Sequence, residues 1–305
     1  MANAAHPAPR ALPGAASALN ALAGVGRFIR LMARNKVGFA GFLGVIFFLI
    51  LSFIVPIFVP IDTATVTGSI YAAPSWAHPL GTDYEGRDIW VQIIHGGADV
   101  IIVGFLTAAI TTVIAVSLGA LTAFVGGRFD ELMMGLTDVV LTIPQFPLLA
   151  VLAAFISLNN AVLVALLLSA LGWPLLLRSV RAQVLSLKER EYVEAARGLD
   201  LGTGHILFRE ILPNMMSYVT ISFTLAATSA VYTEVGLIFL GLVPLSGSNW
   251  GLMMNLAYSR GAVFYPPSMF YILGPVIAVA LFQLSLVFMT RSLEVVFNPR
   301  LAREG

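Results

Sequence analysis

VIIVGFLTAAITTVIAVSLGALTAFV, residues 100–125, decides the fold class, because it contains no charged side chain. An α-helix needs about 20 apolar residues to cross the hydrocarbon core of a bilayer, and this run is long enough. Further segments have the same apolar character at 37–59, 132–156, 160–177, 218–242 and 269–287. The sequence therefore predicts an all-α, polytopic membrane protein with six transmembrane helices.

The overall composition agrees with this prediction. Of the 305 residues, 58% are hydrophobic and 11% charged, and the mean hydropathy is +0.90. A soluble domain of this size exposes too much surface for so few charges. The formal net charge of +1 gives no reason to expect a nucleic-acid partner. The chain has no cysteine, which excludes disulfides and cysteine ligands, and its four histidines lack the spacing of metal ligands.

The basic residues predict how the chain is oriented. If the first span begins inside, every Lys and Arg except Arg87 and Arg260 falls on the inner side. Cytoplasmic loops carry an excess of Lys and Arg, so both termini of this multi-pass protein are predicted to be cytoplasmic.

Four segments follow along the chain. Residues 1–26 are rich in Ala and Pro and predict a mobile cytoplasmic tail, and residues 293–305 form a second tail. Residues 27–99 comprise the first helix and an extracytoplasmic loop, and residues 100–292 form a five-helix core. The apolar run at 37–59 exceeds the roughly 7–15 residues of a signal peptide, so the first helix is predicted to be retained.

The loop SLKEREYVEAARGLDLGTGHILFREILPN, residues 186–214, is long and strongly charged. Tyr192, Ala195, Ala196 and Leu199 recur at helical spacing and form a thin apolar stripe. A connection between two spans needs only a few residues. The pattern therefore favours a docking surface for a cytoplasmic partner over a simple linker.

This loop resembles the signature of binding-protein-dependent importer permeases, the membrane subunits of ATP-binding-cassette (ABC) importers. The resemblance rests on Glu194-Ala195-Ala196 followed by Ile211-Leu212-Pro213. One departure is Asp200, which stands where the family usually has glycine.

Further motifs resemble the second permease subunit of dipeptide, oligopeptide and nickel importers. They are RFIRLMARNKVGFAG (27–41), HPLGTDYEGRDIW (78–90), LTDVVLTIPQFPLLAV (136–151), TEVGLIFLGL (233–242) with NWG (249–251), and NPRL (298–301). The segment MTRSLEVVF (289–297) departs from the family pattern.

The resemblance implies a type I ABC importer permease fold in a bacterial plasma membrane, and a set of partners. These are a second homologous permease, two ATPase subunits that hold ATP and magnesium, and an extracytoplasmic solute-binding protein. It implies transport of dipeptides or oligopeptides, with oligosaccharides or nickel as alternatives. The chain itself has no GxxxxGK[ST] phosphate loop, so it is expected to carry no cofactor and to be no enzyme.

The resemblance also assigns ATPase-coupling residues within the 186–214 loop. They are Glu194, Ala195, Ala196, Arg197, Gly198, Leu199, Gly202, Leu207 and Phe208.

Two acidic residues, Asp138 and Glu234, fall within predicted spans. A lone aspartate there costs about 2.5–3.5 kcal/mol on insertion scales, so each is expected to face protein or water. For Asp138 a structural pair, with Arg178 as the candidate, is favoured over a pore or gating role. Glu234 could line the pore, or it could hold the backbone of the outer loop.

The extracytoplasmic loop carries the charged residues Asp83, Glu85 and Arg87. They could pair with one another and fold the loop, or they could contact the binding protein. The resemblance favours a mixture of the two.

Two other classes of function fit less well. An ion-coupled secondary carrier would need paired intramembrane carboxylates and repeated halves, and the sequence shows neither. An intramembrane protease would need a motif such as HExxH, which is absent.

Overall fold

The computed structural model describes residues 24, 26, 28–61, 67–156, 158, 160–243 and 247–297. Within these residues the chain is helical, and its only β-pairing is an isolated bridge between Thr82 and Asp88. Five helices are long and apolar enough to cross a membrane, and a bent helix pair makes a sixth candidate. The predicted class of all-α polytopic membrane protein is confirmed. Most of both predicted tails lies outside the described residues.

The elements of the first half are α2 (Lys36–Leu49), η1 (Ile50–Ile54), α3 (Val55–Phe58), η2 (Thr67–Ser69), α4 (Ile89–Val125), α5 (Gly127–Thr142) and α6 (Gln145–Phe155). Those of the second half are α7 (Ala161–Lys188), α8 (Glu191–Gly198), α9 (Thr203–His205), η3 (Ile206–Ile211), α10 (Leu212–Asn214), α11 (Met216–Phe239), α12 (Trp250–Ser259), η4 (Ala262–Phe264), η5 (Pro266–Ser268) and α13 (Met269–Phe297).

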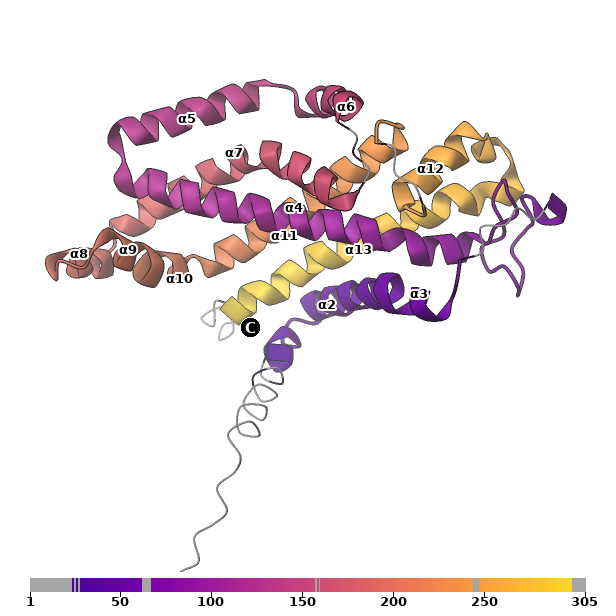
Figure 1. Ribbon diagram of the computed structural model, residues 1–305. Coiled ribbons are helices and arrows are strands. Elements are labelled where there is room, and N and C mark those ends of the chain that lie inside the picture. Colours follow the sequence, from indigo (N-terminus) through magenta and orange to yellow (C-terminus); the bar gives the residue numbers. More distant parts are fainter. Residues whose placement is uncertain are drawn as a thin grey trace, which may run out of the picture.

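The first span packs against the last, although they lie at opposite ends of the sequence (Figure 1). Gly38, Gly41 and Gly44 recur every three residues on α2 and face α13. A Cβ atom at Gly41 would come within 2.4 Å of the Met289 nitrogen. Only glycine therefore allows the two backbones to approach this closely. The span continues through the π-helical turn η1. This turn ends shortly before Pro56, which has no backbone N–H to donate.

Helix α4 is the longest element and runs through the middle of the bundle, with α7 and α11 packed along it (Figure 1). It begins at Ile89, well before the predicted start of its span at 100, because Asp88 caps it. The Asp88 carboxylate accepts from the backbone N–H groups of Trp90 at 2.7 Å and Val91 at 3.1 Å. The helix thus projects past the apolar run that sequence analysis identified.

The span predicted at 132–156 is not one straight helix. It consists of α5 and α6, bent by 80° at a break centred on Ile143 and Pro144. The residue before a proline is pushed into an extended conformation, and Ile143 has ψ 125°. Helix α7 also differs from the prediction, since it continues past Arg178 to Lys188. Pro174 lies within α7 without ending it.

Helix α12 is too short to cross a bilayer and lies between α11 and α13. Its first residue, Trp250, is fully buried and donates from Nε1 to the Ile93 carbonyl at 2.9 Å. The indole packs edge-on against Phe48 and Phe282. One tryptophan therefore joins α2, α4, α12 and α13 at the α12 end of the bundle.

Candidate transport cavity and coupling loop

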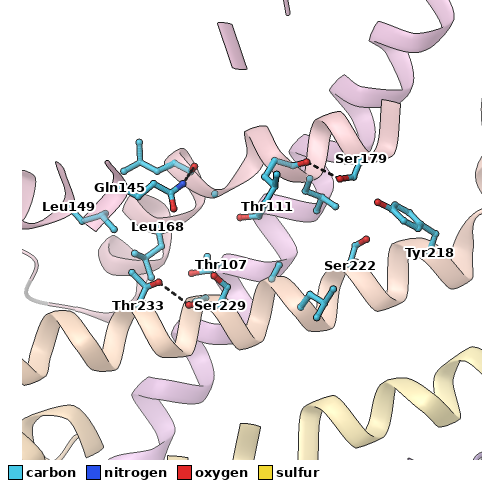
Figure 2. A pocket seen from close by; sticks show the side chains of 17 residues that line it. Thr107, Thr111, Gln145, Leu149, Leu168, Ser179, Tyr218, Ser222, Ser229 and Thr233 are labelled. Carbon is cyan, nitrogen blue, oxygen red and sulfur yellow. Dashed lines mark hydrogen bonds between the residues drawn. The ribbon is translucent and has the colours of Figure 1, made fainter. Parts of the chain in front are cut away.

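A cavity of about 370 Å³ lies between α4, α6, α7 and α11 (Figure 2). Its polar lining consists of hydroxyl and amide side chains, with aliphatic residues between them. Those polar residues are Thr107, Thr111, Gln145, Ser179, Tyr218, Ser222, Ser229 and Thr233. Among the residues that the structure describes, no charged side chain lines it. The cavity can therefore exchange hydrogen bonds with a passing solute without binding a charge tightly.

Several of these polar side chains already form hydrogen bonds within the protein. Thr233 donates to the Ser229 carbonyl at 2.9 Å, and Gln145 Nε2 donates to the Leu171 carbonyl at 2.9 Å, which fastens α6 to α7. The Thr111 hydroxyl is buried without a hydrogen-bond partner among the described residues. Sequence analysis missed this cavity, because its polar side chains come from four separate helices.

Glu234 does not line this cavity. It is fully buried on α11, and its Oε1 accepts from Asn249 Nδ2 at 3.4 Å. Asn249 in turn caps α12, because its Oδ1 accepts from the Gly251 N–H at 2.8 Å. Of the two roles predicted for Glu234, this geometry supports the structural one: the carboxyl group holds the start of α12.

Asp138 forms the predicted ion pair with Arg178, whose Nε also donates to Thr137 Oγ1 at 2.9 Å. A second pair joins Asp130 to Arg181. Both pairs link α5 to the extension of α7 beyond the predicted span. Asp138 thus has a structural partner and lies outside the cavity lining.

The residues assigned to ATPase coupling divide into two groups. Ala196 and Leu207 are buried in a cluster with Val180 and Val184 of α7, so they hold the loop onto the bundle and cannot form its outer surface. The other assigned residues are exposed: Glu194, Ala195, Arg197, Gly198, Leu199, Gly202 and Phe208. Leu199 is 74% exposed and Phe208 67%. The predicted stripe is therefore wrong at Ala196, while Tyr192, Ala195 and Leu199 remain available to a partner.

Asp200 ends α8 in the way a glycine would. Its φ of +55° is left-handed, whereas Gly198 and Gly202 do not have positive φ angles. The Asp200 N–H donates to the Arg197 carbonyl at 2.9 Å, and the Leu201 N–H to the Ala196 carbonyl at 3.2 Å. This pair of bonds is a Schellman motif, which usually has glycine at the left-handed position. The turn thus falls at Asp200 despite the missing glycine.

Arg197 connects the loop to α4. Its guanidinium lies 5.9 Å from the ring centre of Phe124, one residue before the end of that helix. A cation over an aromatic face is attracted by the ring quadrupole. Sequence analysis did not anticipate this contact.

The loop at residues 67–88 is organised around Asp83, which is 1% exposed. Its Oδ1 accepts from the N–H groups of Glu85 and Arg87, both at 2.8 Å, and its Oδ2 from Gln92 Nε2 at 2.8 Å. Asp83 is therefore a folding residue, and of the two roles predicted for it this geometry supports the structural one. Glu85 and Arg87 pair with each other at 2.6 Å and remain partly exposed.

Aromatic contacts fix this loop on the bundle. Arg260 lies 4.8 Å from the ring centre of Tyr84, and the Tyr84 and Tyr271 rings lie 6.2 Å apart. Burial, together with the nearby Glu85, raises the pKa of the Tyr84 phenol. Because the shift is upward, the phenol stays neutral and in place at physiological pH.

A multi-pass helical bundle with a neutral internal cavity and a folded loop at one end has the features of a membrane transport subunit. The family model described as binding-protein-dependent transport system inner membrane component matches residues 115–303. The chain belongs to this family, and it is a membrane-spanning permease subunit of an ABC importer.

Three relatives illustrate the similarity. A Brucella suis biovar 1 protein that carries the name of a peptide permease is 36% identical over 233 residues, 75% of each chain. The oligopeptide transport system permease protein OppC of Bacillus subtilis is 33% identical over 240 residues, 76% of this chain and 78% of the other. OppC of Mycobacterium bovis is 29% identical over 215 residues, 70% and 74%.

Proposed function

We propose that this chain forms one half of the translocation pathway for dipeptides or oligopeptides, delivered by a solute-binding protein. The neutral, hydroxyl-lined cavity carries the proposal, in a chain whose relatives are named as peptide permeases. Peptides share a hydrogen-bonding backbone but differ in side-chain charge. Hydroxyl groups can follow that backbone, whereas a fixed charge in the cavity would retain some peptides and reject others.

The proposal includes three kinds of partner: a second permease that completes the pathway, two ATPase subunits that hold ATP and magnesium, and the binding protein. The exposed residues of α8 and η3 would dock on an ATPase, since an apolar surface around Leu199 and Phe208 is left uncovered there. Arg197 would then pass movement of the docked loop to α4 through Phe124.

The orientation proposed is that of a bacterial plasma-membrane protein with cytoplasmic termini. The basic residues Arg181, Lys188, Arg190, Arg197 and Arg209 gather at the α8 end of the bundle. In the described part of the chain, Arg87 and Arg260 are the only basic residues at the α12 end, His aside. This asymmetry supports an orientation with the α8 end in the cytoplasm.

Copurification tests the assembly. The C-terminally tagged chain, extracted from its native membrane in mild detergent, is expected to bring with it a second permease and one or two kinds of ATPase, identified by mass spectrometry. Recovery of the chain alone, as a stable homo-oligomer, would contradict the importer assembly and favour a carrier.

Reconstituted uptake tests the cargo. Proteoliposomes containing the purified complex, its binding protein and internal ATP are expected to accumulate labelled di- to pentapeptides of varied charge. Uptake of labelled nickel or oligosaccharides, with no peptide uptake, would assign the cargo to one of those classes instead.

A further inference from the structure

Two neighbouring loops at the α12 end expose apolar side chains to an unusual degree. Trp76 in the 67–88 loop is fully exposed, and residues 73–77 around it are all exposed. In the loop between α12 and α13, Phe264 is 85% exposed and Val263 and Tyr265 about half. We refer to Trp76, Val263, Phe264 and Tyr265 as the outer apolar residues.

Both loops have a fixed shape. The Ser75 N–H donates to the His78 carbonyl at 2.9 Å, and the His78 N–H to Ser75 Oγ at 3.1 Å, so Trp76 stands on a closed turn. In the second loop, Ser268 Oγ donates to the carbonyls of Ala262 at 2.7 Å and Tyr265 at 2.8 Å. The hydrogen-bonded turns therefore fix the outer apolar residues in exposed positions.

The two loops are also joined to each other. The Tyr71 and Tyr265 rings lie 5.8 Å apart, and the Tyr71 hydroxyl donates to the Arg260 carbonyl at 3.4 Å. In Figure 1 the 67–88 segment extends beyond the end of α4, on the side opposite to α8. The outer apolar residues thus belong to one rigid platform at that end.

Most charged side chains of the platform form ion pairs, hydrogen bonds or aromatic contacts with other residues of the same platform. Asp83 is buried and fully bonded, Glu85 pairs with Arg87, Asp88 caps α4 and bonds His78, and Arg260 stacks on Tyr84. A partner attracted to this end would find apolar groups rather than free charge.

The same chemistry disfavours lipid as the occupant. Lys and Arg side chains are the groups that usually bind lipid phosphates at a membrane surface. Residues 72–80 contain no Lys or Arg, and the Nδ1 of His78, which could otherwise contact a phosphate, lies 2.9 Å from Asp88. A protein surface with an apolar pocket fits these loops better, and tryptophan is the side chain most often found to anchor such contacts.

We propose that the outer apolar residues dock the solute-binding protein, with Trp76 and Phe264 as the anchors and with little contribution from charge. This inference rests on the proposed function, because it needs a binding protein that approaches this end. It replaces the prediction that Asp83 is a contact and gives Glu85 and Arg87 a minor role.

The test measures the affinity of the purified binding protein for the permease–ATPase complex in nanodiscs. Trp76→Ala and Phe264→Ala should each weaken binding at least about tenfold, the usual effect of removing an aromatic anchor. Basal ATP hydrolysis should not change, since both side chains are exposed and far from α8. Phe47→Ala, which removes an exposed aromatic of the first span that belongs to neither proposed docking surface, is the matched control and should leave the affinity unchanged. Raising the salt to about 0.5 M should change the wild-type affinity less than about twofold, because screening acts on charges.

A probe separates the possible occupants. The chain has no cysteine, so Ala77→Cys, at the exposed neighbour of Trp76, can be labelled at one site with an environment-sensitive fluorophore without removing the proposed anchor. A blue shift that appears only when the binding protein is added supports the proposal. Quenching by brominated lipid without the binding protein would assign Trp76 to the membrane surface. A blue-shifted emission of the assembled permease–ATPase complex before the binding protein is added would assign Trp76 to the contact with the second permease. Either result overturns the proposal, as would normal affinity in both alanine variants.

Failure of this inference is distinguishable from failure of the proposed function. If wild-type complex takes up peptides with its binding protein but the alanine variants bind normally, only the docking site is wrong. If the wild-type complex neither binds a solute-binding protein nor takes up peptides, the importer function itself is wrong.

Discussion

At the scale of a single residue, the left-handed backbone of Asp200 sets the end of the docking helix α8. A β-branched side chain is strained there by about 1–2 kcal/mol, whereas glycine adopts the angle freely. We expect Asp200→Val to speed hydrogen exchange of the Asp200 and Leu201 amides, and Asp200→Gly to leave their protection near wild type. Arg190→Val is the control, since Arg190 already has extended backbone, with ψ 145°. Equal protection in all three variants would show that the turn does not depend on this angle.

Glu234 allows a test of its structural role. Glu234→Gln keeps the acceptor for Asn249 and removes a buried ionisable group, so assembly and transport should stay normal. Glu234→Leu leaves the buried Asn249 amide without this partner, which costs about 1–3 kcal/mol, and should lower the thermal midpoint of the complex. The midpoint can be followed by intrinsic tryptophan fluorescence. Loss of transport in an assembled Glu234→Gln complex would instead support a pore or gating role.

Residue-level prediction from the sequence succeeded where partners could be guessed from charge and failed where they depended on folding. Arg178 was the candidate partner for Asp138, because both lie toward the predicted cytoplasmic side of their spans, and the pair forms. For Asp83 the decisive donors are two loop amides and Gln92, which approach the carboxylate only after the loop has closed. Sequence reasoning therefore left Asp83 as a candidate contact.

At the scale of elements, the contact between α2 and α13 depends on glycine. Gly41→Ala places a Cβ atom within 2.6 Å of Phe288 Cβ and the Ser285 carbonyl oxygen. We expect it to destabilise the protein by about 1–3 kcal/mol through overpacking. Gly135→Ala is the matched control on α5, where a Cβ atom meets nothing within 4 Å and alanine should stabilise the helix by up to about 1 kcal/mol. Denaturant titration of the reconstituted chain measures both. Equal changes in the free energy of unfolding for the two variants would mean that the α2–α13 contact accommodates a Cβ atom at position 41 without loss of stability.

The number of spans followed from apolar length, but the shapes of the helices did not. The 80° bend between α5 and α6 lies at Pro144 and the extended Ile143 before it, and the apolar length of the segment does not indicate this bend. The end of α7 was placed too early, because Arg178 seemed to end an apolar span. In the fold, Asp138 and Thr137 on α5 satisfy that arginine, so the helix continues.

At the scale of the whole molecule, the two ends of the bundle have different surfaces. The α12 end forms a platform whose charges are paired, and the α8 end carries basic residues around a folded loop. Helix α4 runs between them, capped by Asp88 at one end and in contact with Arg197 at the other. A single unbroken helix therefore connects the two surfaces that the proposed partners would use, beside the cavity between them.

The adjacent residues Ala195 and Ala196 separate docking from folding. Ala195 is exposed on α8, so Ala195→Arg should leave membrane insertion and assembly intact, yet uncouple ATP hydrolysis from transport by holding the docking face away from the ATPase. Ala196 is buried against α7, so Ala196→Arg places a charge in an apolar cluster and should prevent the stable assembly itself. Ala182→Arg, at an exposed position of α7, controls for the added charge. Recovery of the complex, ATP hydrolysis and uptake measure the three effects separately. Wild-type coupling in the Ala195→Arg complex would remove this face of α8 from the coupling surface, whereas normal assembly of Ala196→Arg would show that the loop is not held to the bundle through this residue.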